Sequence, residues 1–330
     1  MLLEPFVPKP DPRYAWTSGV IRSLEKKLLR KIDYQKLIDL NEDEIAQFLN
    51  EFGYRGAKSD EMNAQINSLL EFLDKHSNDK QLTDSYRMRW DFKNLTHILK
   101  KRMLYIDFTP EDIIPWGLYG FENYLNAIES EKSEIPEFMI DAVEKARYDY
   151  DTEQEIWRIG MILDAAYLRY FTSKIPKKNQ FLKQYYNILS DQLNVTTAIR
   201  FIEFDYVSRD FEEFYVDYGY IDYDFLYSLW ETDRSGLVNR FIHTKYGKPL
   251  QDAVGDSLSD EDMLPLSNYF LSKRISYLMQ SIYSAFGLEV LVAYFEKKRI
   301  EIDTLRTLIR VKSGNLEKEH IERTVSYVLL

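Results

Sequence analysis

The stretch LEVLVAYFEKKRIEIDTLRTLIRVKSG, from Leu288 to Gly314, decides the fold class. Its apolar residues recur every three or four positions, which is the spacing of one face of an α-helix. A glycine follows the last periodic residue, and glycine commonly ends a helix. We therefore predict one long helix that ends at Gly314, with the basic run Lys297 to Arg299 facing away from its apolar stripe. The stripe consists of Leu288, Leu291, Val292, Phe295, Ile302, Leu305 and Ile309.

The rest of the chain has the same helical character. Only 12 glycines and 10 prolines occur in 330 residues, and alternating apolar segments are few and short. Thr109 before Pro110 is a typical helix start. Thr152 with Glu155 is typical of a capping box ahead of a long helix. The sequence therefore predicts an all-α fold.

Composition excludes several classes of function. The formal net charge of −11 argues against a general nucleic-acid binder, which needs a positive surface for phosphates. The chain has no cysteine, so disulfides and zinc–thiolate sites are excluded. The longest apolar runs are far shorter than the ~20 residues that cross a bilayer. We expect a cytoplasmic protein that reaches a membrane only through partners.

One sequence block recurs three times. It reads DFKNLTHILKKR from Asp91, DQLNVTTAIRFI from Asp191 and EIDTLRTLIRVK from Glu301, at separations of 100 and 110 residues. A second block, IDYQKLIDL from Ile32 and IDYDFLYSL from Ile221, opens two of these units, whereas the middle unit matches it poorly. Such recurrence indicates diverged helical repeats. We predict three units, spanning residues 1–105, 106–208 and 209–330.

These blocks resemble the family of C subunits of V/A-type rotary ATPases (ATP synthases), whose eukaryotic V-ATPase counterpart is the d subunit. The closing stretch from Leu291 to Val325 resembles the family's C-terminal signature, and RWDFKNLTHILKKR and ILSDQLNVTTAIRF resemble its two D-x-x-N-L blocks. The N-terminal pattern also fits, with Tyr14, Arg22, Glu25, Leu28 and Leu29 at the family's spacing. The third block departs from the family, because Thr304 stands where asparagine is usual.

The resemblance implies a funnel of three similar helical subdomains around a pseudo-threefold axis. It also implies a non-catalytic rotor subunit, a monomer within its complex, that joins the central shaft (the D and F subunits) to the membrane proteolipid ring. Such a subunit transmits torque for ion transport or ATP synthesis and lies on the inner face of the membrane. The resemblance implies no cofactor, no bound metal, no nucleotide and no nucleic acid.

An acidic, aromatic-rich segment from Phe204 to Trp230 is the candidate partner interface. It holds eleven aromatic residues, and acids are interspersed among them. Such a surface suits a basic helical coiled coil, with tyrosines as anchors and acids that steer the approach. The alternative is that the aromatic residues form core and the acids form solvated helix faces. The candidate interface residues are Asp210, Glu212, Glu213, Tyr215, Asp217, Tyr218, Tyr220 and Asp222.

The recurring acid and polar residues stand three apart, so each pair shares one helix face. They either line a repeated polar surface that touches the shaft or form buried hydrogen bonds that set the packing of each unit. We favour the structural role, because buried polar groups need partners. The pairs are Asp91 with Asn94, Asp191 with Asn194, and Glu301 with Thr304.

Two other functions compete with the rotor role. A helical-repeat scaffold with another client has the same periodicities. A metal-dependent all-α enzyme acting on a diphosphate needs aspartate-rich helix faces, but the acid clusters lack a DDxxD run, and we expect them at helix starts, where the helix dipole favours them. The Gly247-Lys248-Pro249 segment is not a P-loop. The clusters are Asp149, Asp151, Glu153 and Glu155, and Asp256, Asp260, Glu261 and Asp262.

Overall fold

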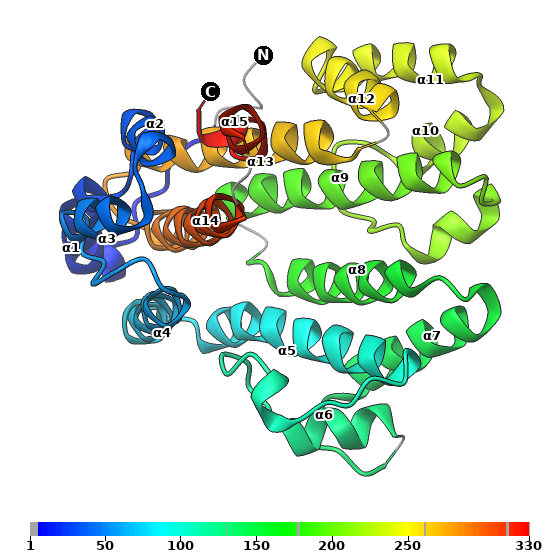
Figure 1. The fold of residues 1–330 in the computed structure, drawn as a ribbon, viewed down its shortest axis with the longest axis horizontal. Helices are drawn as coiled ribbons and strands as arrows, with labels where there is room; N and C mark the ends of the chain where they lie inside the picture. Colours follow the sequence, from blue (N-terminus) through cyan, green and yellow to red (C-terminus); the bar gives the residue numbers. More distant parts are fainter. Residues whose placement is uncertain (1–5, 130, 177–178, 261, 315–316, 330) are drawn as a thin grey trace. The chain divides into compact units, whose positions relative to one another are not determined.

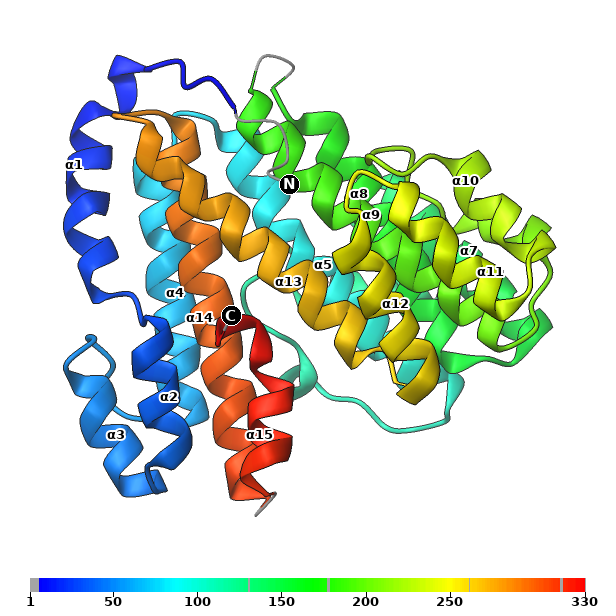
Figure 2. The ribbon, with the colours of Figure 1, turned by 90° about the horizontal axis from the view of Figure 1, so that it is seen from above.

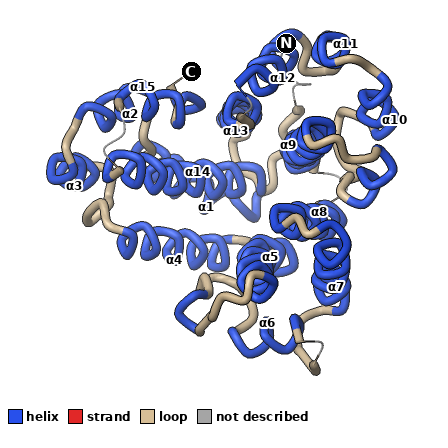
Figure 3. The backbone as a smooth tube through the Cα atoms, turned by 45° about the vertical axis from the view of Figure 1, so that its right-hand side comes forward, coloured by secondary structure: helices blue, strands red, loops and turns tan. Residues whose placement is uncertain are grey.

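The computed structural model describes residues 6–129, 131–176, 179–260, 262–314 and 317–329. Within these ranges the chain folds into helices and loops without a strand (Figure 3), so the predicted all-α class is confirmed. No helix in the described part is long and apolar enough to cross a membrane.

Contacts divide the chain into two compact units. Unit 1 contains residues 1–78, 180–188 and 233–330, and unit 2 contains residues 79–179 and 189–232. These units follow spatial contacts, whereas the three expected units follow recurring sequence blocks. The three-unit organisation stays a prediction.

Unit 1 is built around one long helix, α14 (Leu288–Ser313), which packs against α1, α4 and α13 (Figure 2). The helix ends at Gly314, as predicted, although this glycine has φ −79° and needs no left-handed backbone. The other helices are α1 (Ala15–Leu24), α2 (Lys31–Asp39), α3 (Glu42–Asn50), α4 (Ser59–His76), α11 (Arg234–Arg240), α12 (Lys248–Asp260), α13 (Leu264–Met279) and α15 (Lys318–Thr324).

Unit 2 contains a layer in which α8 packs against both α5 and α7 (Figure 1). Its core includes Tyr86, Tyr167 and Phe171, whose rings contact one another edge to face or tilted. The helices are α5 (Lys80–Met103), α6 (Phe121–Ile128), α7 (Glu137–Glu153), α8 (Ile156–Lys174) and α10 (Tyr223–Tyr227), and α9 (Gln180–Glu203) contributes its residues from 189 onward.

Two predicted helix starts are wrong. Pro110–Asp112 forms only a 3-10 turn, η3, so Thr109 caps no long helix. Thr152 belongs to the last turn of α7, and the residue before α8 is Glu155. The reason lies at Gln154, whose left-handed backbone ends α7 and turns the chain directly into α8.

The basic run of α14 does not face away from the core. Lys298 and Arg299 are buried, and each pairs with an acid three residues away on the same helix. Lys298 contacts Glu301 at 2.6 Å and Arg299 contacts Glu296 at 2.7 Å. The pairs neutralise their own charges, which lets a charged run enter the core.

Candidate functional site

Asp91 and Asn94 hold the loop that follows α5. Oδ1 of Asp91 accepts hydrogen bonds from the backbone N–H groups of Leu118 (2.8 Å) and Tyr119 (3.2 Å) and from the Tyr124 hydroxyl (2.6 Å). The Asn94 amide donates to the carbonyl of Ile114 and accepts from its N–H, at 2.9 and 2.8 Å. This pair of side chains therefore fixes the loop at two points.

Asp191 and Asn194 repeat the arrangement on α9. Asp191 accepts from the backbone N–H groups of Tyr220 and Ile221, at 2.9 and 3.0 Å. Asn194 exchanges two hydrogen bonds of 2.9 Å with the backbone of Val216. The middle and third sequence units thus open with the same hydrogen bonding, although their opening sequences match poorly.

A glycine within each loop makes room for the carboxylate. A Cβ on Gly117 would lie 2.1 Å from Oδ1 of Asp91, and a Cβ on Gly219 would lie 2.3 Å from Oδ1 of Asp191. These glycines align GLYGFENYL from Gly117 with GYIDYDFLY from Gly219. The two glycines mark the equivalent loops in the sequence. The isoleucine–aspartate–tyrosine block does not mark them, because the loop after α5 lacks it.

The third cluster, on α14, differs in detail. Glu301 accepts from the N–H of Leu29 and from the hydroxyl of Tyr54, both at 2.6 Å. Lys298 also donates to Tyr54, at 3.0 Å, and lies 4.2 Å from the centre of its ring. Burial and the charge of Glu301 raise the pKa of Tyr54. Thr304 donates to the carbonyl of Ile300 and contacts the Tyr327 hydroxyl, so it holds no loop as the asparagines do.

All six recurring residues are buried, each at most 3% exposed. The aspartates and asparagines hold loops, Glu301 and Thr304 make other buried contacts, and none of the six side chains is exposed. Burial raises the pKa of Asp91 to about 6, against the opposing effect of its three donors. Its second oxygen, Oδ2, has no hydrogen-bond partner among the described residues, which explains why desolvation dominates.

The acids of the candidate interface are mostly exposed. Glu212 and Glu213 lie in the 3-10 helix η4 (Ser208–Glu213) and face solvent, as does Asp217, whereas Asp210 is half-buried. Asp222 is exposed and accepts from the N–H of Phe225 at 2.7 Å to cap α10. Asp222 thus has a local structural task, whereas Glu212 and Asp217 are exposed to solvent.

The tyrosines of this segment are half-buried. Burial raises the pKa of Tyr215 and of Tyr218 to about 12. Tyr220 is tied by its N–H to Asp191. Phe211, Phe214, Ile221 and Leu226 are core residues. The segment therefore has apolar residues inside and acids outside, with tyrosine edges between them.

Arg169, which the sequence did not single out, anchors the acidic segment to α8. Its guanidinium donates to the carbonyls of Glu213 (2.6 Å) and Tyr215 (2.7 Å). Lys145 on α7 pairs with the Glu213 carboxylate at 3.4 Å. The segment is thus held on the α7–α8 layer rather than extending freely.

The acid clusters mark helix starts only in part, because Glu155 directly precedes α8 and Asp262 accepts from the N–H of Leu264 at the start of α13. Asp149, Asp151 and Glu153 lie in the last turns of α7, where the helix dipole disfavours negative charge. Asp149 is neutralised by Arg158 through contacts of 2.6 and 2.8 Å, and Glu155 accepts from the Trp157 indole.

In the second cluster, Asp256 lies within α12, and Asp262 contacts Arg323 at 3.3 Å. Glu261 and the side chain of Asp260 lie outside the described residues. In the described part, no three acids or histidines are grouped as a metal site would need.

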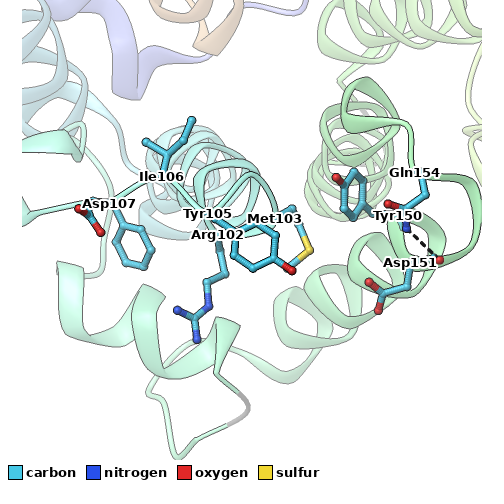
Figure 4. A pocket seen from close by; sticks show the side chains of 9 residues that line it. Arg102, Met103, Tyr105, Ile106, Asp107, Tyr150, Asp151 and Gln154 are labelled. Atoms are coloured by element: carbon cyan, nitrogen blue, oxygen red, sulfur yellow. Dashed lines mark hydrogen bonds between the residues drawn. The ribbon is translucent and has the colours of Figure 1, made fainter.

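A groove of about 760 Å³ opens at one end of unit 2. Figure 4 shows Tyr105, Ile106 and Asp107 from the turn after α5, opposite Asp151 and Gln154 from the end of α7. The Gln154 amide donates to the last carbonyls of α7, at 3.0 and 3.1 Å. Sequence reasoning missed this groove, because its residues lie almost 50 positions apart.

One protein family matches nearly the whole chain. The model of this family, described as ATP synthase (C/AC39) subunit, matches residues 17–324. No curated protein matches the chain. The family match covers all three recurring blocks.

Proposed function

The chain belongs to the ATP synthase (C/AC39) subunit family, a family of rotary ATPase subunits, and from this premise we propose that it is a non-catalytic rotor subunit. In this role it joins the central shaft, made of the D and F subunits, to the membrane proteolipid ring. It transmits torque for ion transport or ATP synthesis and lies peripherally on the cytoplasmic face. The observation that carries the proposal is the family match across residues 17–324.

The buried clusters support a mechanical role. Asp91 with Asn94 and Asp191 with Asn194 each hold a loop to its helix through several buried hydrogen bonds. Buried hydrogen-bond networks rigidify the structure around them. A joint that carries torque needs such loops to keep their position. The three-unit organisation over residues 1–105, 106–208 and 209–330 is part of this proposal.

The shaft-binding surface in this proposal includes the acidic segment. Glu212, Glu213 and Asp217 are exposed and are set beside half-buried tyrosines. Exposed acids raise the association rate of a basic partner, and partly buried tyrosines supply anchoring contact area.

The test is gel filtration with light scattering of the purified chain mixed with the D–F pair from the same source. We expect a co-eluting complex of one chain with one shaft pair, and no ATP hydrolysis by the chain alone. Separate elution with a folded shaft pair would contradict the proposal and favour a helical scaffold with another client.

A further inference from the structure

Three helix ends of unit 2 have an unusual backbone. Tyr105, Gln154 and Asp205 have φ of 56°, 59° and 56°, and they are the non-glycine residues with positive φ in the described chain. Gln154 directly follows the end of α7, and Tyr105 and Asp205 are the second residues after the ends of α5 and α9. Glycine usually occupies this position, because a Cβ costs about 1 kcal/mol or more there. A strained residue retained at each end points to a function of its side chain.

These three turns lie at the same end of unit 2 (Figure 1). Tyr105 and Gln154 line one groove. Trp157, at the start of α8, packs 5.8 Å from the rings of both Phe204 and Tyr206 in the turn after α9. We call Leu104–Asp107, Asp151–Gln154 and Phe204–Val207 together the helix-end face.

The helix-end face exposes large apolar side chains. Tyr105 is 97% exposed, Phe204 62% and Val207 52%. In the turn after α5 the exposed aromatic ring stands beside the groove, whereas in the equivalent turn after α9 Tyr206 packs on Arg158 at 4.8 Å. An exposed tyrosine beside an open groove is typical of a binding anchor.

The same face carries uncompensated negative charge. Asp107, Asp151 and Asp205, one at each turn, are exposed, and no salt bridge joins them to another described residue. Two nearby cations pair with other acids: Lys101 pairs with Asp112 at 2.6 Å and also donates to the Asp107 carbonyl, and Arg102, which lines the groove, pairs with Glu129 at 3.5 Å. Three helix C-termini add the negative ends of their dipoles. The face thus attracts a cationic partner.

We propose that the helix-end face binds a basic, apolar helical segment of the central shaft, with Tyr105 as the anchor. This inference rests on the proposed function and names a further contact surface for it. The negative charge of the face favours the central shaft over the membrane ring as its partner. The cytoplasmic leaflet around the ring is itself anionic and repels an acidic face, whereas a basic shaft segment is attracted to it. Phe204–Val207 belongs both to the helix-end face and to the acidic segment, and η4 follows it directly in the chain.

The experiment measures the Kd of the full chain for the D–F shaft pair by calorimetry, for wild type and three variants. Tyr105→Gly removes the anchor and relieves the left-handed strain, so the fold is retained. Phe204→Ser removes a second exposed ring. Tyr283→Ser is the control, because this tyrosine of unit 1 is 77% exposed but lies outside the face. A second arm repeats the measurements with the proteolipid ring in nanodiscs.

We expect Tyr105→Gly to weaken shaft binding about tenfold or more and Phe204→Ser about threefold or more, as for interface aromatic residues. Tyr283→Ser should stay within about twofold, and ring binding should not change in the two face variants. Unchanged shaft affinity in both face variants overturns the inference and leaves the rotor function standing. Weakened ring binding with intact shaft binding assigns the face to the ring instead. Failure of wild type to bind the shaft pair refutes the rotor function and, with it, this inference.

Discussion

Replacing Gly117 by alanine is expected to destabilise the protein by about 2–5 kcal/mol. The new Cβ would lie 2.1 Å from Oδ1 of Asp91 and 2.7 Å from the Tyr124 hydroxyl. Carbon and oxygen atoms do not approach this closely, so the loop or the carboxylate must move by about 1 Å. Both groups are buried, and neither is the end of a flexible side chain.

The magnitude follows from the hydrogen bonds that this movement breaks. Oδ1 accepts from two backbone N–H groups and one hydroxyl, at 2.8, 3.2 and 2.6 Å. Each buried donor left without a partner costs about 1–3 kcal/mol. Loss of one or two of the three costs about 1–6 kcal/mol, and the middle of this interval is the expected range. Gly219→Ala should have a similar effect, because its Cβ would lie 2.3 Å from Asp191.

The assay is thermal unfolding followed by circular dichroism. A loss of 1 kcal/mol lowers Tm by about 2–4 °C in domains of roughly 150–250 residues, so we expect a decrease of about 5 °C or more. Gly160→Ala in α8 is the control within the same unit, because its Cβ would meet the flexible end of Lys100 at 3.2 Å and otherwise makes an ordinary van der Waals contact of 3.7 Å with Thr96. Equal Tm values for Gly117→Ala and Gly160→Ala would refute the role of the Asp91 cluster.

Three further predictions address charge. Asp91 has a folded pKa of about 6, above its ordinary value of 3.8, so the stability it contributes is present below pH 3.8 and is lost as pH rises through 6. The free energy of unfolding of Asp91→Asn, measured by urea unfolding, should therefore rise relative to that of wild type by up to about 3 kcal/mol between pH 4 and 7. A difference between the two proteins that does not change with pH would contradict this. Asp149→Asn leaves the buried Arg158 without its acid and should cost about 3–5 kcal/mol; adding Arg158→Met should recover part of that loss, which the same urea titration measures. Reversing Glu212 and Asp217 to lysine should weaken shaft binding more at low than at high salt, and equal weakening at both would show that these acids do not steer the contact.

The helical class and the long C-terminal helix could be predicted from the sequence, because periodicity reports which face of a helix is buried. The same reasoning misplaced Lys298 and Arg299, because it treats charged residues as solvent-facing. Their partners, Glu301 and Glu296, stand three residues away and signal a pairing that permits burial. Spacing between opposite charges was therefore as informative as apolar spacing.

The loops of the candidate site could not be predicted in the same way. Asp91 and Asp191 bind backbone N–H groups, and a backbone donor carries no side-chain signature in the sequence. The sequence indicates these contacts only through Gly117 and Gly219, where a larger residue would collide with the carboxylate. The groove beside Tyr105 could not be predicted from the sequence, because nothing in the sequence indicates that this tyrosine adopts a left-handed backbone conformation.

The hydrogen bonds of Glu301 have a consequence for synthesis of the chain. Its partners Leu29 and Tyr54 are 272 and 247 residues earlier in the sequence, whereas Asp91 finds its partners within 33 residues. At about 5–20 residues per second, the N-terminal helices wait about 15–55 s on the ribosome before α14 emerges. During that interval Leu37 and Leu49, which are fully buried in the finished fold, lack the contacts that α15 and α14 make with their helices, α2 and α3. The N-terminal segment is therefore the part of the nascent chain that most needs a chaperone, and a chain truncated before α14 would leave it exposed to proteases.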